Sequence, residues 1–417
     1  MTSRNLNNLT FLKRRKADIF STLDIQSHNS LIETPILDEC LFSIVIPVRD
    51  EADYLSKTLD SFINQTDFQN SPLDSSLFEV IILANNCRDN SAEIVKNRQK
   101  KNPNFNLHCA EINLPDENAN IGFVRRLLMN EAYLRLKSNK FGGGIIATTD
   151  GDTCAAPDWI INIADEIENG ADAVGGRILI DENEVKLLDD KARNFHLLDE
   201  EYRLLAAEIE DFYDQIPHDL PPRHHQHFNG SFAVTTDAFA RAGGVPDVKF
   251  LEDAAFYNAL LRIDAKFRHS PNVKVFTSAR NRGRTALGLS TQLNEWEIMG
   301  KNGDVYLVES AQTIEKRLTA RRELRKFWRS IKSENLLDFT EISTLTEQLC
   351  IPNVSLLTAL KNSETFGILM EKLIAEQNAT EKWKQENPLV SVEEAISDLR
   401  KKLAEFHSAD KFRKKTA

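Results

Sequence analysis

The chain has 417 residues, of which 41% are hydrophobic and 28% charged, as in an ordinary globular protein. Its formal net charge of −11 gives no support for nucleic-acid binding. No apolar run approaches the roughly 20 residues that a membrane-spanning helix needs, and the five cysteines are scattered without a CxxC pair. We therefore expect a cytoplasmic chain of two or three domains with reduced thiols.

Predicted strands and helices alternate after a polar, irregular arm at residues 1–40. Uninterrupted apolar and β-branched runs predict strands at 42–48, 78–83, 105–111, 144–149, 228–235 and 273–276. Helices are expected from Asp53 (as N-cap), from Ser91, and over 123–136, 158–167, 183–213 and 252–263, with a charged helical region from about 289.

This alternation is typical of an α/β fold with a mostly parallel sheet flanked by helices. We expect an arm over 1–40 and an α/β domain over 41–290 with a helical insertion at about 183–213. A helical C-terminal region would follow over 291–417. In such sheets ligands bind beyond the carboxyl ends of the strands, where the strand order reverses.

Polar clusters follow three of the predicted strands: Arg49-Asp50-Glu51, Asn85-Asn86 and Asp150-Gly151-Asp152. Two carboxylates one residue apart can converge on one hard divalent cation, which leaves other coordination positions for phosphate oxygens. The glycine between them allows close approach of a ligand backbone or diphosphate. The other interpretation of the triplet is an Asx-Gly turn before the next helix.

Four segments resemble, in order and spacing, those of glycosyltransferase family 2, which has the GT-A fold. They are SIVIPVRDEADYLSKTLDSF, EVIILANNCRDNSAEIV, IIATTDGDTCAAPDWI, and the stretch from GSFAVTTDAFARAGGVPDVKF to LEDAAFYNALLRIDAKFRHSPNVKV. The resemblance covers residues 42–296 and implies a hexosyltransferase-like enzyme. Such an enzyme moves a sugar from a nucleotide-diphosphate sugar to an acceptor hydroxyl, with inversion. The Gln-x-x-Arg-Trp motif of processive synthases is absent, so non-processive transfer is expected.

The resemblance implies that Asp150 and Asp152, the DxD motif, bind Mn²⁺ or Mg²⁺, with Asp152 as the direct ligand. A late histidine often completes such a site, and His225 is the candidate, with His224, His227 and His269 as others. The alternative for each histidine is a solvated loop imidazole.

The nucleotide-sugar pocket is expected to contain Pro47, Arg49, Glu51, Asn85, Asn86, Arg125, Asp150, Gly151, Arg280 and Arg284. The family often has Asp where this chain has Ala84, so base recognition would fall to the two asparagines. The arginines suit a diphosphate or a phosphorylated acceptor, although a surface ion-pair cluster is an equal alternative. Glu51 could otherwise be a first-turn helix acid.

Inverting transfer needs a general base near the acceptor hydroxyl. By family position this base is Asp253, with Glu252 as the alternate. Both could instead be acids that stabilise a helix N-terminus.

A basic amphipathic segment at 314–332 could lie on an anionic membrane, which would place the chain at the inner membrane face. The other interpretation is a solvated face or one that packs on acidic neighbours.

The acceptor is open: a lipid, a saccharide or a small phosphorylated metabolite. A nucleotidyltransferase on a related sheet is a second possibility, but its usual Gly-rich basic loop is replaced by the acidic Arg49-Asp50-Glu51-Ala52. A catalytically silent binding or scaffold protein is the third, and the intact acids argue against it.

Overall fold

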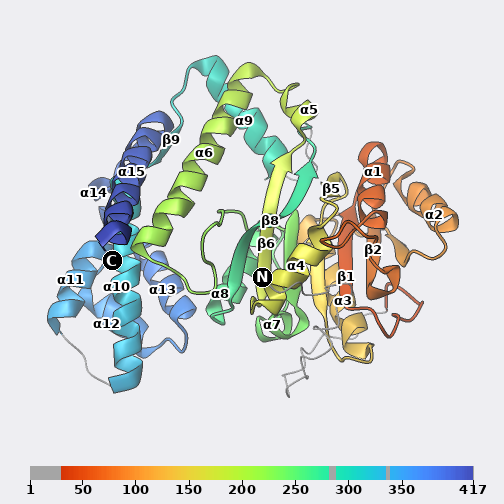
Figure 1. Cartoon of the computed structure of the whole chain (residues 1–417), viewed down its shortest axis with the longest axis horizontal. Coiled ribbons are helices and arrows are strands. Elements are labelled where there is room, and N and C mark those ends of the chain that lie inside the picture. The colour runs from red at the N-terminus through yellow and green to blue at the C-terminus, as the bar shows by residue number, and fades with distance from the viewer. Residues whose placement is uncertain (1–29, 281–287, 335–338, 417) are drawn as a thin grey trace. The chain divides into compact units, whose positions relative to one another are not determined.

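The computed structural model describes residues 30–280, 288–334 and 339–416. The chain divides into two compact units (Figure 1). The first unit comprises the chain up to Leu188, Gln226–Leu260 and Ala265–Gln292. The second comprises Asp189–His225, Leu261–Asp264 and Leu293–Ala417.

The first unit is built on an eight-stranded sheet with the order β3-β2-β1-β4-β7-β6-β8-β5. The strands are β1 (Phe42–Val48), β2 (Phe78–Asn85), β3 (Leu107–Ile112), β4 (Ile145–Thr149), β5 (Thr153–Ala155), β6 (Ala173–Ile180), β7 (Ser231–Thr235) and β8 (Phe267–Thr277). β1 pairs in parallel with both β2 and β4, β2 with β3, and β6 with β8. Because β7 runs antiparallel to β4 and β6, and β5 to β8, the sheet is mixed but mostly parallel. The expected α/β fold is confirmed.

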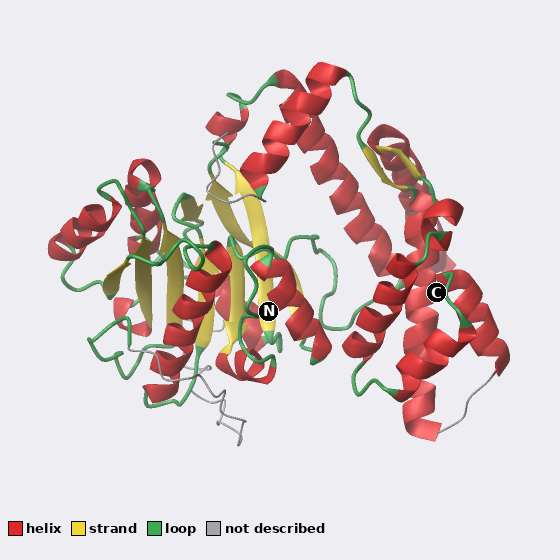
Figure 2. Cartoon of the chain, turned by 180° about the vertical axis from the view of Figure 1, so that it is seen from behind, coloured by secondary structure: helices red, strands yellow, loops and turns green. Residues whose placement is uncertain are grey.

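Helices pack against this sheet, whose strands lie side by side in Figure 2. They are α1 (Ala52–Ile63), α2 (Ser91–Lys101), α3 (Ile121–Ser138), α4 (Trp159–Glu168), α5 (Glu182–Val185), α7 (Thr236–Arg241) and α8 (Glu252–Arg262), with the short 3₁₀ helix η2 (Ser75–Leu77). α3 contacts β1 and β4, and α4 contacts β6 and β8. All seven residues of β1 are buried, which explains its uninterrupted apolar sequence.

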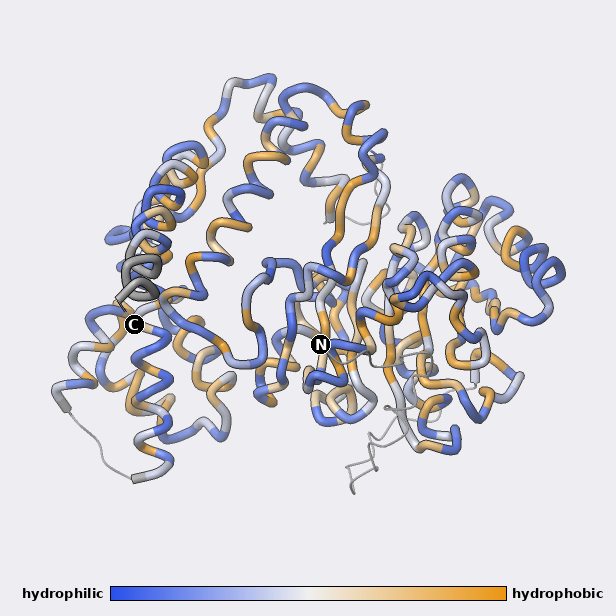
Figure 3. Tube along the Cα trace, viewed as in Figure 1, coloured by the Kyte–Doolittle hydropathy of each residue, from blue (hydrophilic) through white to orange (hydrophobic). Residues whose placement is uncertain are grey.

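The apolar core joins the sheet to α1 and α4. Leu55, Leu59 and Phe62 lie on one face of α1 and are fully buried. Phe62 meets Trp159 of α4 edge to face, with ring centroids 5.8 Å apart. Figure 3 shows hydrophobic residues concentrated in the strands that these helices cover.

The N-terminal strands follow the sequence closely. β1 has the predicted bounds, and β2 extends the predicted 78–83 by two residues. The N-cap of α1 is Glu51, so the prediction of Asp53 was wrong, and Asp53 lies in the first turn. The predicted strand 273–276 is the end of the eleven-residue β8.

Two elements differ because of their local chemistry. β6 was not predicted from the sequence, because Gly175 and Gly176 interrupt its apolar pattern at a register shift of the ladder. The predicted helix 183–213 is two helices, α5 and α6 (Asp190–Tyr213). The Asp189 side chain accepts hydrogen bonds from the Lys191 and Ala192 N–H groups and thereby starts α6.

Helices dominate the second unit, as expected for the C-terminal region. Besides α6, its elements are α9 (Leu289–Asn302), β9 (Leu307–Glu309), α10 (Ala311–Glu334), α11 (Phe339–Leu349), α12 (Asn353–Lys361), α13 (Phe366–Ala379), α14 (Lys382–Glu386), β10 (Leu389–Ser391) and α15 (Val392–Thr416). The part of α9 before Leu293 belongs to the first unit. β9 and β10 form a separate antiparallel pair.

The basic helix α10 packs inside its own unit. Leu324 and Phe327 are fully buried in an apolar cluster with α11, α12 and α13. Arg321 and Arg325 both donate to the buried carboxylate of Asp214. The apolar face of α10 is therefore covered, and these two charges are paired, as in the alternative of a face that packs on acidic neighbours. Among the described helices, none is both long and apolar enough to cross a bilayer.

Candidate functional site

The predicted strand-end clusters meet at one edge of the sheet. β1 is flanked in parallel by β2 and β4, with Val48 opposite Ala84 and Val45 opposite Thr148. The residues that follow these strands therefore share the carboxyl edge, where ligands bind in sheets of this kind.

Gly151 fits closely against the end of β1. A Cβ atom added there would lie 3.0 Å from Glu51 Cγ and 3.2 Å from Val48 Cγ2. The Gly151 carbonyl also accepts a 2.9 Å hydrogen bond from Thr58 Oγ1 on α1. The glycine thus lets the acidic turn pack on Glu51, a role in the protein itself that the sequence analysis did not foresee.

Asp152 lies in a nearly closed environment, with 11% of its side chain exposed. Its Oδ2 accepts a 2.6 Å hydrogen bond from Ser278 Oγ and lies 3.2 Å from Arg280 Nη2. Burial raises the pKa of the Asp152 carboxyl above its ordinary value, Arg280 lowers it, and the Asp150 carboxylate raises it again. The protein therefore compensates this charge only in part.

Arg280 links Asp152 to Glu51. Its Nη2 donates to Glu51 Oε1 at 2.8 Å, and its Nη1 donates to Glu51 Oε2. The guanidinium also lies 5.8 Å from the ring centroid of Tyr54. Arg280 was expected near a diphosphate, and in this structure it holds two carboxylates. Arg284 falls outside the described residues.

Arg125 is buried beneath the acids, with 2% of its side chain exposed. Its Nη2 donates to Asp150 Oδ1 at 2.7 Å, and its Nη1 donates to the Thr149 carbonyl at 3.2 Å. Its Nε lies 3.6 Å from Glu252 Oε1. One guanidinium thereby joins the end of β4 to the start of α8, so it positions these acids.

Replacement of Arg125 by glutamine is expected to lower the free energy of unfolding by about 3 kcal/mol. The change leaves the buried Glu252 carboxylate without the buried cation beside it. The neighbouring Arg126 is the matched control, since it is 31% exposed and its ion-pair partner Asp247 is 73% exposed. Arg126→Gln should cost less than about 1 kcal/mol. Denaturant unfolding compares the two, and equal losses would contradict the positioning role.

Glu252 and Asp253 begin α8. The preceding Leu251 has a φ of 54°, an unusual conformation for leucine that turns the chain into the helix. Glu252 is 6% exposed, and its Oε1 accepts a 3.4 Å hydrogen bond from Asn229 Nδ2. Burial raises the pKa of both carboxyls; for Asp253 the Ala254 N–H and Arg125 lower it and Asp150 raises it.

The two asparagines at the end of β2, its last residue Asn85 and the following Asn86, differ in what they can bind. The Asn86 amide donates to the Leu114 carbonyl at 2.9 Å and accepts from the Leu114 N–H at 3.1 Å. It therefore bridges the ends of β2 and β3. Asn85 is 5% exposed at the same edge, and Pro47 is paired opposite Leu83. Arg49 Nη1 donates to the Ala119 carbonyl at 2.9 Å, before α3.

Ligand atoms of Asp50, Cys87 and Asp89 lie within 4.8 Å of one another, a cluster that the sequence analysis missed. Asp50 Oδ1 accepts from the Arg88 N–H at 2.6 Å. The Asp89 carboxylate accepts from the N–H groups of Ala52 and Ser91 at 3.0 Å. Asp89 thus bonds the first residues of α1 and α2, and Asp50 bonds the loop before α2, so these bonds give the two acids a structural role.

The candidate histidines lie in two environments. His225 belongs to the second unit, with its Nε2 3.9 Å from Glu200 Oε1. His227 and His269 belong to the first unit, where His227 stacks on Tyr257 at a centroid distance of 4.0 Å. The His227 and His269 ring centroids are 6.3 Å apart.

The acids fit a divalent cation by their chemistry. Five carboxylates belong to the cluster: Glu51, Asp150, Asp152, Glu252 and Asp253. Two guanidinium groups, Arg125 and Arg280, are paired with them. Oxygen ligands and this excess of negative charge suit Mg²⁺ or Mn²⁺. Asp150 and Asp152 would hold the ion.

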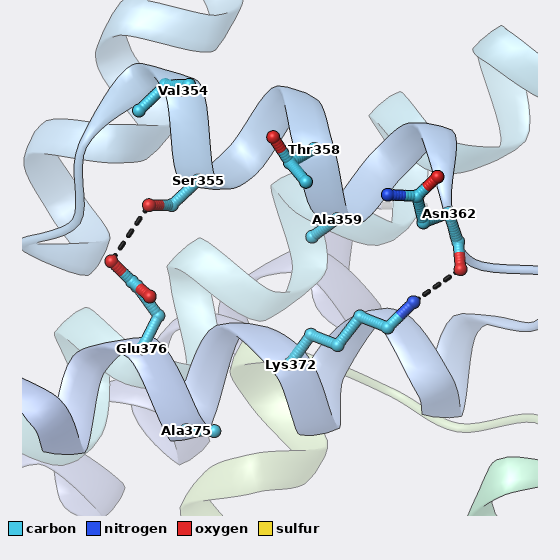
Figure 4. A pocket seen from close by; sticks show the side chains of 8 residues that line it. All are labelled: Val354, Ser355, Thr358, Ala359, Asn362, Lys372, Ala375 and Glu376. Carbon is cyan, nitrogen blue, oxygen red and sulfur yellow. Dashed lines mark hydrogen bonds between the residues drawn. The ribbon is translucent and has the colours of Figure 1, made fainter.

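A separate open pocket lies in the second unit, between α12 and α13 (Figure 4). Ser355 Oγ donates to Glu376 Oε1 at 2.8 Å, and Lys372 Nζ donates to the Asn362 carbonyl. The remaining lining residues are Val354, Thr358, Ala359 and Ala375. The Glu376 carboxylate is already bonded to Ser355 across the pocket. We therefore infer no phosphate or metal chemistry there.

Several site residues had no signal in the sequence. Ser278 and Tyr54 contact the Asp152–Arg280 pair, and Asn229 contacts Glu252. The Glu184 carboxylate accepts a 2.6 Å hydrogen bond from the Ala279 N–H and holds the chain after β8. Ser278 could have been found only from the full length of β8, which ends at Thr277.

Comparison with solved structures finds several proteins of low sequence identity to this chain. S. aureus TarS 1–349 in complex with UDP is 14% identical, with a TM-score of 0.39, over 83% of this chain and 91% of that one. The mannosyltransferase PcManGT from Pyrobaculum calidifontis, in complex with GDP-Man and Mn²⁺, is 14% identical, with a TM-score of 0.40, over 84% of each chain. Glucosyl-3-phosphoglycerate synthase from Mycobacterium tuberculosis is 15% identical, with a TM-score of 0.34, over 65% of this chain and 83% of that one.

No curated protein matches the sequence significantly. Residues 43–123 match the family model described as glycosyl transferase family 2. This segment contains β1, α1, β2, α2 and β3 and ends before the acidic turn. The match agrees with the resemblance in the sequence motifs. The similarity to this family is therefore carried by the first part of the sheet, residues 43–123.

Proposed function

We propose that the protein transfers a sugar from a nucleotide-diphosphate sugar to an acceptor hydroxyl, with metal dependence, inversion and a single addition per binding event. The observation that supports the proposal is that one guanidinium, Arg125, contacts both Asp150 of the acidic turn and Glu252, the neighbour of Asp253. A displacement at an anomeric carbon needs acids that hold the metal at the donor diphosphate, here Asp150 and Asp152. It also needs a base for the acceptor hydroxyl, here from the Glu252–Asp253 pair.

Asp150 and Asp152 would hold the Mn²⁺ or Mg²⁺ ion. When bound, such an ion stabilises the negative charge that develops on the departing nucleoside diphosphate. Arg125 and Ser278 keep the two carboxylates oriented through bonds of 2.7 Å and 2.6 Å. The nucleoside would lie near Pro47 and Asn85, with Glu51 as an acceptor for a base or ribose donor.

Asp253 would accept the proton of the acceptor hydroxyl while the oxygen of that hydroxyl attacks the anomeric carbon. The bond from that carbon to the diphosphate oxygen breaks on the opposite side, and the configuration inverts. Glu252 is already engaged by Arg125 and Asn229, which favours Asp253 as the base. The acceptor itself is a lipid, a saccharide or a small phosphorylated metabolite.

Two other functions make different predictions. A nucleotidyltransferase would release pyrophosphate, whereas the proposed enzyme releases a nucleoside diphosphate. A silent scaffold would release neither, even on long incubation. Slow release of nucleoside diphosphate from a nucleotide sugar and water would indicate the transferase. Release of pyrophosphate from a nucleoside triphosphate and a sugar phosphate would indicate the nucleotidyltransferase, and neither product would indicate the scaffold.

Calorimetry with a panel of nucleotide sugars, with and without Mn²⁺ or Mg²⁺, tests the donor proposal. We expect metal-dependent binding of a uridine or guanosine diphosphate sugar. Equal affinity with metal and with a chelator would contradict metal dependence. Binding of no nucleotide sugar under either condition would contradict the donor class.

The pH profile should show an acid limb set by Asp253. A base acts only when ionised, and burial raises the pKa of this carboxyl above the usual aspartate value of about 3.9. The value of kcat should therefore fall as the pH decreases through that raised pKa. The residual rate of Asp253→Asn should lack this limb, and an unchanged limb in the variant would assign it to another group.

A further inference from the structure

Arg280 lies between Glu51, the acid expected at the nucleoside, and Asp152, the expected metal ligand. We propose that Arg280 is an internal cation that competes with the metal for Asp152 in the donor-free protein and is transferred to the diphosphate when the donor binds. The inference rests on the proposed function. It predicts that the metal alone binds weakly until the guanidinium leaves.

The contacts of Arg280 are those of a group that neutralises both acids. Each Nη of its guanidinium donates to one oxygen of Glu51, the bidentate geometry that arginine forms with carboxylates. The same Nη2 lies 3.2 Å from Asp152 Oδ2, which also accepts from Ser278. One oxygen of the expected ligand is thus engaged by two donors before any metal arrives.

A metal on Asp152 would compete directly with this arrangement. A Mg²⁺-sized ion lies about 2.1 Å from its carboxylate oxygen, so a guanidinium within hydrogen-bond reach of the same carboxylate repels it strongly. With 11% of the Asp152 side chain exposed, solvent screens this repulsion little. Metal binding therefore requires the Arg280–Asp152 contact to lengthen.

A diphosphate provides Arg280 with another partner. Guanidinium pairs with phosphate as readily as with carboxylate, and in the same bidentate geometry. The donor would draw Arg280 away from Asp152 and free that carboxylate for the metal. Diphosphate and metal would then favour each other's binding, and the coupling is reciprocal.

The backbone can support such a transfer without moving. Ser278 and Ala279 are 6% and 7% exposed, and the Ala279 N–H is bonded to Glu184 at 2.6 Å. The Arg280 side chain, which is 21% exposed, begins at the next residue. Rotation of its own side-chain bonds is enough to redirect the guanidinium.

The test is Mn²⁺ affinity without nucleotide, measured by electron paramagnetic resonance of free Mn²⁺ in wild type and Arg280→Gln. We expect the variant to bind the ion about tenfold more tightly, because it lacks the competing cation. The gain in Mn²⁺ affinity on adding UDP or GDP should be smaller in the variant. Unchanged or weaker nucleotide-free affinity in Arg280→Gln would overturn the proposal.

Arg268→Gln is the matched control. Arg268 lies on β8, is 13% exposed, and pairs with Glu166 at 3.2 Å, so the change removes an equal charge from a similar environment. Its Mn²⁺ affinity should equal that of wild type, and an equal tightening would attribute the effect to net charge and overturn the proposal. Thermal unfolding checks that both variants fold.

The double variant Arg280→Gln/Asp152→Asn locates the ion. The tenfold gain should disappear in it, and a retained gain would place the metal elsewhere and overturn the inference. Failure of wild type to bind Mn²⁺ even with UDP or GDP would contradict the proposed function. An unaltered nucleotide-free affinity in Arg280→Gln, with normal nucleotide-dependent Mn²⁺ binding in wild type, would contradict the Arg280 inference alone.

Discussion

Replacement of Asp152 by asparagine is expected to abolish metal-dependent donor binding and to lower turnover about 10³-fold. The amide keeps the shape of the side chain and its bond with Ser278, but it removes the charge that would hold the metal. Loss of several kcal/mol of charge stabilisation at the leaving group corresponds to a rate loss of about this size. Calorimetry with and without Mn²⁺ measures the binding, and nucleoside diphosphate release measures the turnover.

Asp158→Asn is the matched control for this experiment. Asp158 is the N-cap of α4, six residues along the chain, and its side chain makes no capping hydrogen bond. The control should keep metal-dependent binding and near-normal turnover. Retained metal dependence in Asp152→Asn would mean that the acidic turn is a structural turn, the alternative that its sequence also allowed.

Replacement of Asp253 by asparagine should lower turnover by about 10²- to 10⁴-fold while leaving donor affinity unchanged. A general base contributes a factor of this size, and it acts on the acceptor hydroxyl, away from the nucleotide. A single-turnover assay with saturating donor measures the chemical step, and calorimetry measures donor affinity in the same variant.

Glu252→Gln distinguishes the two acids at the start of α8. Glu252 is buried against Arg125 and Asn229, so its loss should mainly lower stability. At a temperature where the variant is folded, most of the turnover should remain. If Glu252→Gln lost turnover and Asp253→Asn kept it, the base would be Glu252, the alternate that the resemblance allowed.

The sequence was sufficient to predict which residues lie at the carboxyl edge of the sheet. β1 is covered on both faces, so its apolar run is continuous and its end is marked by the change to Arg49. The same logic located the end of β4 and came within two residues of the end of β2, and parallel pairing brings the three strand ends together. The rule that ligands bind at this edge was then enough to expect these side chains at one site.

The sequence was insufficient for contacts between distant segments. Arg125 lies 25 positions from Asp150, and Arg280 lies 229 positions from Glu51. Both arginines were assigned to the nucleotide, because a guanidinium suits phosphate as well as carboxylate. Only the fold shows that each holds two acids. For the basic helix α10, likewise, periodicity could not say whether lipid or Asp214 would meet its charges.

Diffraction at the manganese edge from crystals soaked with Mn²⁺ and UDP or GDP tests the central claim most directly. The account predicts one anomalous peak within about 2.5 Å of an Asp152 carboxylate oxygen and of the diphosphate, with the Arg280 guanidinium on the phosphates. A peak at Asp50 and Asp89 instead, or nucleotide bound with no metal at Asp152, would contradict it.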